Sequence, residues 1–488
     1  MAVATVDELT LPKTLSWKDG FMISLSVPAG VLASLGVSIG SLGAWGAAFL
    51  WGICCLVGLM QNQLFAEMAA MFPEKPGGIA LYAHEAWRKY FAPIGPICAF
   101  GYWMGWSFVL AIFGLVIGQL VQAQWFAGQT WTFSDGFINV GLPHLIGAGT
   151  VIAVWLLNIF GIRPAMRVNW GVGIALITAL AVFIIGPFVT GDWHSSALHW
   201  HLGDSGQAWG GVKLAMVWLF LMGWSGYATE ICATFAPEYK ETRRDTAKAL
   251  RAAGLLTLAV LVLLPVASTG VVGEKFAAAN PASFYVQVFQ QVVGSASGLV
   301  VAVVVAALFM SMNASTGDAS RALFGLARDD MTIKQLHHLN KHRMPGRAMT
   351  LDLLVNLFLL FFVGNVLGIL FASNIGYMTA ITFSVAAFAL LRKDRPDWPR
   401  PIRVAAFWVP IAIALAIFNG ALVIVGGSNP SLTGYGGTKE TITGLVLLFS
   451  SLVFYAYRRI VQDKTGLRLR ETTPTLPDDV VATAAPAG

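Results

Sequence analysis

The sequence predicts an all-α integral membrane protein with about twelve transmembrane helices, and two observations favour this fold class. Of 488 residues, 56% are hydrophobic and only 11% are charged, whereas ordinary soluble domains carry about 25% charged residues. Apolar stretches also recur along nearly the whole chain, each close to the ~20 residues that a helix needs to cross a bilayer. Too little charged sequence remains to coat a soluble core of this size, which excludes a large soluble protein.

The expected spans follow in chain order, and the ninth and tenth are closely joined. They lie at 21–46, 47–71, 93–124, 143–162, 168–190, 211–236, 251–273, 297–327, 349–366, 368–391, 404–427 and 440–461. Residues 1–20 open with acidic and polar side chains instead of a basic start and a short apolar core, so no cleaved signal peptide is expected. Residues 465–488 lack periodicity and are predicted to form a disordered tail.

The basic residues predict the orientation, because cytoplasmic loops of membrane proteins hold the excess of Lys and Arg. With the N-terminus inside, 28 of the 31 basic residues fall on the cytoplasmic side, and the exceptions are Lys213, Lys275 and Lys439. Both termini are therefore expected in the cytoplasm, most simply of a bacterial inner membrane. The formal charge of +6 is a topology signal and does not indicate nucleic-acid binding.

Two spans carry signs of a broken helix, which carriers use to expose backbone groups at mid-membrane. The first span contains Pro28 and Gly30, and the sixth contains Gly223, Gly226 and one acid, Glu230. These spans are corresponding members of two five-helix halves, as in inverted-repeat carriers. We expect repeats at 21–190 and 211–391, followed by two peripheral helices at 404–461.

Three segments resemble the amino acid–polyamine–organocation (APC) transporters. FAEMAAMFPEKPGGIALYAHEA (65–86) is similar to the signature after the second span of that superfamily, GYATEICATFAPEYKETRRDTAKAL (226–250) to its sixth-helix exit, and SRALFGLARDDM (320–331) to its eighth-helix end. The matching residues are Glu67, Phe72, Pro73, Gly77, Gly78, Tyr82, Glu230, Glu238, Arg243, Arg244, Arg321, Ala327, Arg328 and Asp329.

The resemblance implies a LeuT-like fold of five plus five helices and a permease for amino acids, polyamines or related organic amines. It implies proton-linked transport or exchange, with Glu230 as the proton-linked residue, and no cofactor or enzymatic activity. The first span departs from the superfamily's Gly-Ser-Gly-Ile-Phe, because Pro28 lacks an amide and Ala29 lacks a hydroxyl. A carboxylate cradle there has fewer donors, which favours recognition of the amine.

The candidate substrate site joins both breaks to neighbouring aromatic side chains. Trp224 offers a face for an ammonium group, and a charge at mid-bilayer such as Glu230 usually faces a cavity or a proton path. The alternatives are lipid-facing packing for the tryptophan and a helix-bracing protonated acid. The substrate-binding candidates are Ala29, Gly30, Val31, Tyr102, Trp106, Trp224, Tyr227 and Glu230.

The eighth span offers a second set of polar residues. Ser315 and Thr316 are weak sodium candidates, because sodium-coupled relatives of this architecture bind the ion through eighth-helix hydroxyls. Sodium-coupled symport is therefore the alternative within transporters, although small hydroxyl residues also serve helix packing. Asp318 is expected to pair with Arg321 one turn later.

Other functional classes receive little support from the sequence. A phosphate-binding loop, a His-Glu-x-x-His motif, a nucleophile elbow and a repeated selectivity filter do not occur, which disfavours a nucleotide-driven pump, an intramembrane enzyme and a channel. The four cysteines lie in apolar stretches without metal-ligand spacing. Zinc can bind a cluster such as His194, His199 and His201, but an exposed loop is the simpler interpretation.

Overall fold

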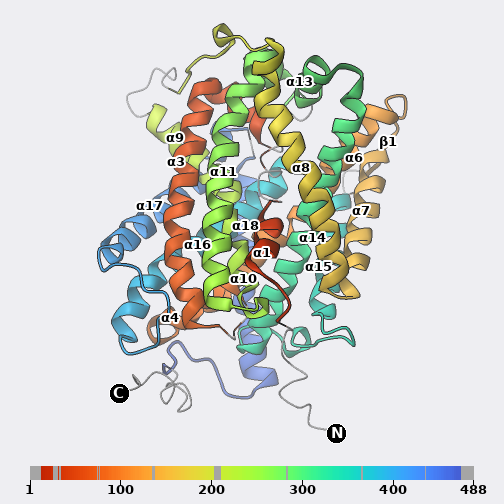
Figure 1. The fold of residues 1–488 in the computed structure, drawn as a ribbon. Coiled ribbons are helices and arrows are strands. Elements are labelled where there is room, and N and C mark those ends of the chain that lie inside the picture. The colour runs from red at the N-terminus through yellow and green to blue at the C-terminus, as the bar shows by residue number, and fades with distance from the viewer. Residues whose placement is uncertain are drawn as a thin grey trace.

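The computed structural model describes residues 13–25, 31, 34–73, 75, 77–134, 138–202, 210–281, 284–363, 366–434 and 436–473. Most of these residues form long helices that run side by side (Figure 1). The helices of the predicted spans include α3 (Leu35–Met71), α5 (Ile94–Ser107), α6 (Val109–Trp125), α7 (Leu142–Ile159), α8 (Ile162–Thr190), α9 (Gly210–Gly226), α11 (Thr242–Val272), α14 (Ser297–Arg328), α15 (Gly346–Phe358), α16 (Val366–Asp394), α17 (Trp408–Ser428) and α18 (Thr438–Tyr457).

Nine helical segments of the described residues are long and apolar enough to cross a membrane, and they fall in nine of the twelve predicted windows. The other three windows are also helical but interrupted or short. The first holds α1 (Trp17–Ser24) and the start of α3, and the sixth holds α9, a short 3-10 turn η4 (Ala228–Glu230) and α10 (Ile231–Thr234). The ninth holds α15, which continues into the π-helical turn η8 (Leu359–Val363). An α-helical membrane protein of the predicted class is confirmed.

Helix α3 consists of two spans joined at Gly43, where φ is +72° and ψ is 165°. This backbone conformation is essentially restricted to glycine. A Cβ atom at Gly43 would also lie 2.5 Å from the carbonyl oxygen of His199. Residues 35–42 therefore end the first span and residues 44–71 form the second, so the predicted boundary between 46 and 47 is three residues too late.

The connections contain structure that hydropathy did not predict. A two-stranded antiparallel ribbon, β1 (Thr132–Ser134) and β2 (Asn139–Gly141), precedes α7, with Phe133 opposite Val140. Helix α4 (Gly78–Phe91) follows the second span, while α12 (Glu274–Ala279) and α13 (Phe284–Val293) lie between the seventh and eighth spans. These elements are short or amphipathic, so an 18–20-residue apolar window does not detect them.

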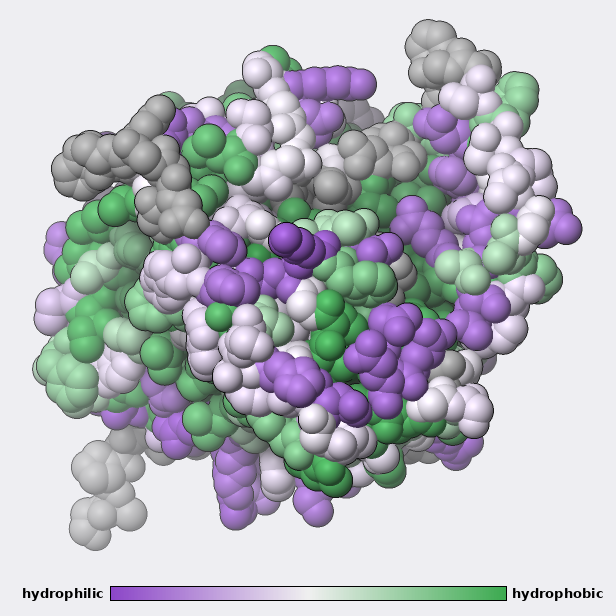
Figure 2. All heavy atoms as spheres, turned by 90° about the horizontal axis from the view of Figure 1, so that it is seen from above, coloured by the Kyte–Doolittle hydropathy of each residue, from purple (hydrophilic) through white to green (hydrophobic). Residues whose placement is uncertain are grey.

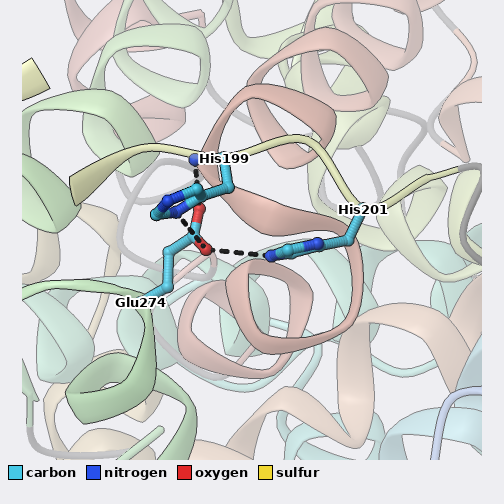
Figure 3. Close-up of side chains that lie close together, drawn as sticks. All are labelled: His199, His201 and Glu274. Carbon is cyan, nitrogen blue, oxygen red and sulfur yellow. Dashed lines mark hydrogen bonds and ion pairs between the residues drawn. The ribbon is translucent and has the colours of Figure 1, made fainter. Parts of the chain in front are cut away.

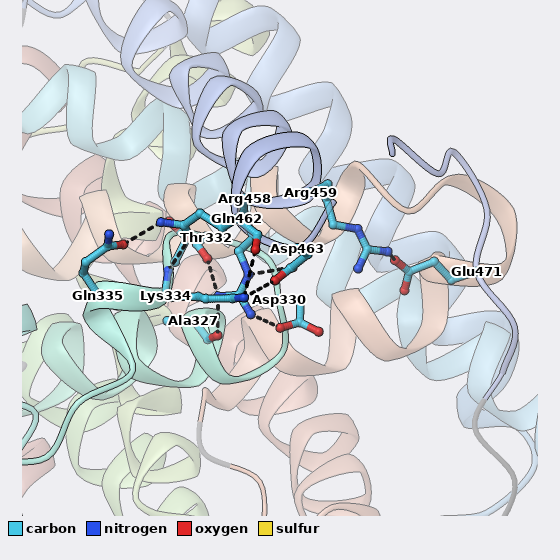
Figure 4. Close-up of polar contacts among 10 residues, drawn as sticks. All are labelled: Ala327, Asp330, Thr332, Lys334, Gln335, Arg458, Arg459, Gln462, Asp463 and Glu471. Atoms are coloured by element: carbon cyan, nitrogen blue, oxygen red, sulfur yellow. Dashed lines mark hydrogen bonds and ion pairs between the residues drawn. The ribbon is translucent and has the colours of Figure 1, made fainter. Parts of the chain in front are cut away.

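Basic residues at one end of the bundle hold several segments together. Arg458 of η10 (Arg458–Gln462) donates to the carbonyl oxygens of Ala327 at 3.3 Å and Thr332 at 3.2 Å, and forms ion pairs with Asp330 and, at 2.7 Å, Asp463 (Figure 4). Nearby, Glu471 pairs with Arg459 (Figure 4) and with Arg88 of α4. The end of the last span is thereby fixed to the loop after α14 and to α4.

Glu67, in the segment that resembles the APC signature, is a buried hub at the same end. Its carboxylate accepts hydrogen bonds from the guanidinium of Arg392 at 2.9 and 2.6 Å and from the amide of Val404 at 2.8 Å. Arg400 lies 3.2 Å from the same carboxylate. The signature acid therefore holds the second span against the last turn of α16 and the loop that follows it.

A second buried acid, Glu85 of α4, is enclosed by basic groups. Lys75 lies 2.6 Å and Arg395 2.7 Å from its carboxylate oxygens. Burial raises the pKa of Glu85, but Lys75, His84 and Arg395 outweigh this effect and lower the pKa to about 2. The carboxylate therefore remains charged at neutral pH and holds α4 against the end of the tenth span.

The opposite end of the molecule, viewed in Figure 2, has a polar centre. Hydrophilic side chains gather towards the middle of this face, and hydrophobic ones are frequent near its edge (Figure 2). The flanks of the bundle also expose large apolar side chains such as Ile174, Val189, Leu299 and Ile424. An apolar girdle of this kind is expected of a protein whose sides contact lipid.

Candidate functional site

The sixth span is interrupted beside the middle of the second span. Helix α9 ends at Gly226, and residues Ala228–Glu230 form a 3-10 turn before α10 begins. A Cβ atom at Gly58 of α3 would lie 2.7 Å from the carbonyl oxygen of Gly226, so only glycine permits this approach of α3 to the break. The predicted break in the sixth span is therefore present, and it ends at Glu230.

Glu230 is fully buried, and three aromatic side chains from two other spans contact its carboxyl group. The indole nitrogen of Trp106 donates to Oε1 at 3.1 Å, and the hydroxyl of Tyr377 donates to the same oxygen at 2.9 Å. The hydroxyl of Tyr102 lies 3.1 Å from Oε2. An acid in this environment meets the requirement that buried polar groups be hydrogen-bonded.

Tyr102 links Glu230 to a second buried acid on the eighth span. Its hydroxyl oxygen lies 3.0 Å from Oδ1 of Asp318 and 2.8 Å from the hydroxyl of Thr234. A tyrosine hydroxyl carries one proton, and an ionised carboxylate only accepts. The tyrosine can therefore donate to Glu230 or to Asp318, but not to both at once.

A small cavity of about 20 Å³ lies beside this network. Its walls come from α5, α6, the sixth-span break, α14 and α16. Trp224 lies in the wall, where its indole nitrogen donates to the carbonyl oxygen of Gly105 at 3.2 Å and its ring meets that of Phe113 edge-on, with centroids 5.9 Å apart. The lining residues are Gly105, Trp106, Val109, Phe113, Trp224, Ser225, Ala228, Ser311 and Tyr377.

This volume has room for about one water molecule, whereas small-molecule sites usually span about 300–1,000 Å³. The cavity is therefore too small for an amino acid in this structure. On the side of the basic end, Glu238 and Arg321 form a buried ion pair at 2.5 Å, and Arg321 also donates to the carbonyl oxygen of Gly317 at 2.8 Å. Leu15, from the segment before α1, accepts from the amide of Lys240 at 2.8 Å and donates to the carbonyl oxygen of Glu238 at 2.9 Å.

The structure brings some of the sequence candidates together and separates others. Tyr102, Trp106, Trp224 and Glu230 meet at the network or the cavity. Tyr227 instead donates to the side-chain oxygen of Asn419 on α17 at 3.2 Å, so its hydroxyl is engaged by a peripheral helix.

The first-span candidates are only partly visible. Val31 is fully buried, while Ala29 and Gly30 lie outside the described residues, as does Pro28. On the eighth span, the hydroxyl of Thr316 donates to the carbonyl oxygen of Met312 at 3.0 Å. The buried hydroxyl of Ser315 has no hydrogen-bond partner within the described part of the chain.

Sequence reasoning missed three contributors and misassigned one pair. Tyr377, Thr234 and Ser311 complete the network and the cavity wall. For Tyr377 the available signal was the polar run Ser-Asn-x-Gly-Tyr inside an apolar span. The predicted pairing of Asp318 with Arg321 is wrong, because Arg321 is bound by Glu238 and Asp318 faces Tyr102.

Comparisons with known proteins agree with this architecture. Residues 15–451 match the family model described as amino acid permease. The amino-acid permease RocE of Bacillus subtilis is 24% identical over 367 residues, which cover 71% of this chain and 72% of that protein. An uncharacterized amino acid permease of the same organism, YvbW, is 23% identical over 373 residues, or 73% of this chain and 77% of that protein. The amino-acid permease GAP5 of Candida albicans is 23% identical over 350 residues, or 69% of this chain and 53% of that protein.

Proposed function

Because the chain belongs to the amino acid permease family, we propose that it moves amino acids or related organic amines across a membrane by alternating access. The observation that carries this proposal is the contracted cavity between the sixth-span break and the aromatic side chains of the third and tenth spans. Alternating access needs a site that is closed in one state and open to each side in others. The buried network around Glu230 supplies such a closed state.

The proposed substrate site lies between the predicted first-span break at Ala29 to Val31 and the sixth-span break at Glu230. Trp106 and Trp224 supply aromatic faces, which attract an ammonium group by about 0.5–2 kcal/mol. The carboxyl of Glu230 supplies the complementary charge. Together these groups favour recognition of the substrate's amine over its carboxylate.

Glu230 and Asp318 are also the proposed route for a coupling proton. If both acids were ionised, Tyr102 could donate its one hydrogen to only one of them, and the other would lack that hydrogen bond. The geometry therefore supports a state in which one of the two carboxyl groups retains its proton. A substrate ammonium that enters and contacts Glu230 would favour release of that proton. Exchange of one substrate for another uses the same site without net proton movement.

Uptake by purified protein in liposomes tests the proposal. Radiolabelled amino acids and their amines should accumulate, and an amine should compete about as well as its parent amino acid, whereas the matching keto acid should fail. Loss of the ammonium contact should weaken competition by about 10- to 150-fold, because hydrogen bonds to charged groups contribute about 1.5–3 kcal/mol. If only solutes with both groups compete, the first-span backbone binds the carboxylate and the amine-first proposal is wrong.

Sodium coupling is the second candidate, and it is favoured by the hydroxyl of Ser315, which has no hydrogen-bond partner among the described residues. Replacement of sodium by choline in the same uptake assay separates the two mechanisms. Proton-linked transport or exchange leaves uptake unchanged, whereas a sodium symporter loses it. In the latter case, Ser315→Ala should weaken the dependence on sodium more than Thr316→Ser does.

We also propose that both termini are cytoplasmic and that the protein resides in a bacterial inner membrane. The basic clusters at the end of the bundle shown in Figure 4 support this orientation. Thr5→Cys, Trp200→Cys and Val480→Cys provide single labelling positions, since the four native cysteines are buried. A membrane-impermeant thiol reagent applied from outside should label only position 200. Labelling of position 480 from outside would overturn the orientation.

A further inference from the structure

At the end opposite the basic clusters, a loop and the start of a short helix bring three side chains of metal-binding types together. His199 and His201 lie in the connection between α8 and α9, and Glu274 is the first residue of α12. Nδ1 of His199 lies 3.2 Å and Nε2 of His201 lies 3.1 Å from Oε2 of Glu274 (Figure 3). The sequence places the histidines 73 or more residues from this acid, so only folding makes them neighbours.

Glu274 is positioned by the backbone independently of the two histidines' rings. Its Oε1 accepts from the amide of Ala44 at 2.8 Å and from the amide of His199 at 2.7 Å. The second oxygen, Oε2, is thereby directed towards both imidazoles.

The spacing of the three ligand atoms fits a small divalent ion. One ligand atom from each side chain can be chosen so that all lie within 4.8 Å of one another. Tetrahedral Zn²⁺ with bonds of about 2.0–2.1 Å places its ligand atoms about 3.3 Å apart. The two contacts to Glu274, at 3.1 and 3.2 Å, already have this length.

We propose that His199, His201 and Glu274 form a binding site for a divalent transition-metal ion, with Zn²⁺ as the best-fitting one, and that water completes its coordination. Imidazole and carboxylate ligands suit Zn²⁺, whereas Ca²⁺ and Mg²⁺ prefer sites made of oxygen atoms alone. The anchoring of Glu274 by two backbone amides is the kind of outer-shell support that fixes metal ligands.

The site is accessible to solution. The His199 and His201 side chains are 58% and 43% exposed, while Glu274 is 11% exposed. A hollow of about 510 Å³ adjoins all three and is also lined by Gly40, Lys275 and Phe276. An ion therefore reaches the ligands directly from the surface, without opening of the helix bundle.

A metal at this position would join three segments that meet at the end of the first span. The carbonyl oxygen of His199 accepts from the amide of Trp45 at 3.2 Å, and the amide of His201 donates to the carbonyl oxygen of Leu42 at 2.9 Å. Both contacts flank the turn at Gly43. Bound Zn²⁺ would hold this turn, the loop before α9 and α12 at fixed spacing. If these segments separate during alternating access, which rests on the proposed function, Zn²⁺ should slow transport.

Isothermal titration of the purified full chain with ZnCl₂, using a purification tag without histidine, tests the binding site. Wild-type protein should bind one Zn²⁺ per chain saturably. The double variant His199→Ala/His201→Ala removes two ligands. Its affinity for Zn²⁺ should fall by at least the 10- to 100-fold typical of weakened metal sites. Glu274→Gln should do the same while its amide oxygen can still accept from the backbone of Ala44.

His194→Ala is the matched control, because His194 is an exposed histidine of the same loop that lies outside the cluster. This variant should bind Zn²⁺ as tightly as the wild type does. Undiminished binding by the double variant, or equal loss in His194→Ala, would overturn the site. Binding is read without transport, so it does not depend on the proposed function. Zn²⁺ that binds without slowing uptake in liposomes would refute only the effect on transport.

Discussion

Replacement of Glu230 by alanine and by glutamine separates its role as an acceptor from its role as a proton carrier. Alanine removes the oxygen that accepts from both Trp106 and Tyr377. Each buried donor left without a partner costs about 1–3 kcal/mol, so Glu230→Ala should lose about 2–6 kcal/mol of stability. Tyr102 retains Asp318 and Thr234 as partners and adds little to this loss.

Glutamine preserves the accepting oxygen and places an amide where Oε2 stands, next to the oxygen of Tyr102. Glu230→Gln should therefore lose no more than about 1 kcal/mol, the usual net value of one neutral hydrogen bond. Thermal unfolding of purified protein, followed by intrinsic tryptophan fluorescence, measures both variants. Membrane proteins often unfold irreversibly, so the comparison uses the order of apparent midpoints at one heating rate.

The same glutamine variant then tests the proton. Uptake by Glu230→Gln in liposomes should lose its dependence on pH, since glutamine cannot titrate, while the variant remains folded. Equal destabilisation by alanine and glutamine would refute the hydrogen-bond reasoning. A wild-type pH profile in Glu230→Gln would instead leave Glu230 as a structural brace.

Three further predictions concern stability. Gly43→Ala should lower the stability by at least the ~1–3 kcal/mol of a strained residue, because the backbone has φ +72° and a loop carbonyl oxygen lies 2.5 Å from the new Cβ. The control is Gly149→Ala, because Gly149 is exposed and its new Cβ would have nothing within 4 Å. In thermal unfolding this control should be neutral or stabilising. Arg321→Met should lower the stability by about 3–5 kcal/mol, because it leaves Glu238 as a buried unpaired charge. Adding Glu238→Gln to the same chain should recover part of this loss. No recovery would contradict the pairing. For Glu85, burial raises the pKa but the basic neighbours lower it from 4.5 to about 2, so its contribution is present above pH 4.5 and is lost as pH falls towards 2. Glu85→Gln should therefore be less stable than wild type at neutral pH, and the difference should shrink below pH 4.5; a constant difference would refute the linkage.

Much of the site was predictable because charge inside an apolar span is costly. Glu230 stood out as the acid of the sixth span, and the glycines before it indicated where the helix breaks. The aromatic candidates Tyr102, Trp106 and Trp224 were chosen by type and position, and the structure places all three at the network or the cavity. Tyr227 passed the same criteria, yet its hydroxyl meets Asn419, because neighbouring residues of a helix point in different directions.

Other features lay beyond sequence reasoning because they depend on which helices become neighbours. Tyr377 is 147 residues from Glu230, and Glu274 is more than 70 residues from His199 and His201. The spacing of Asp318 and Arg321 suggested a local ion pair, but a buried guanidinium gains more from a well-aligned carboxylate than from a nearby one. Glu238 offers that geometry from the segment that follows the sixth span.

The sequence by itself determined the membrane class, the approximate positions of the spans and the interruption of the sixth. Each of these properties is local, because a helix in lipid satisfies its own backbone hydrogen bonds and needs only enough apolar length. Tertiary structure alone decided that Tyr102 joins Glu230 to Asp318, that the cavity beside them is small, and that the loop before α9 and the start of α12 bring His199, His201 and Glu274 together. Such contacts arise when helices pack and buried polar groups take the partners that lie within hydrogen-bonding distance, and no pattern along the chain encodes which partners those are.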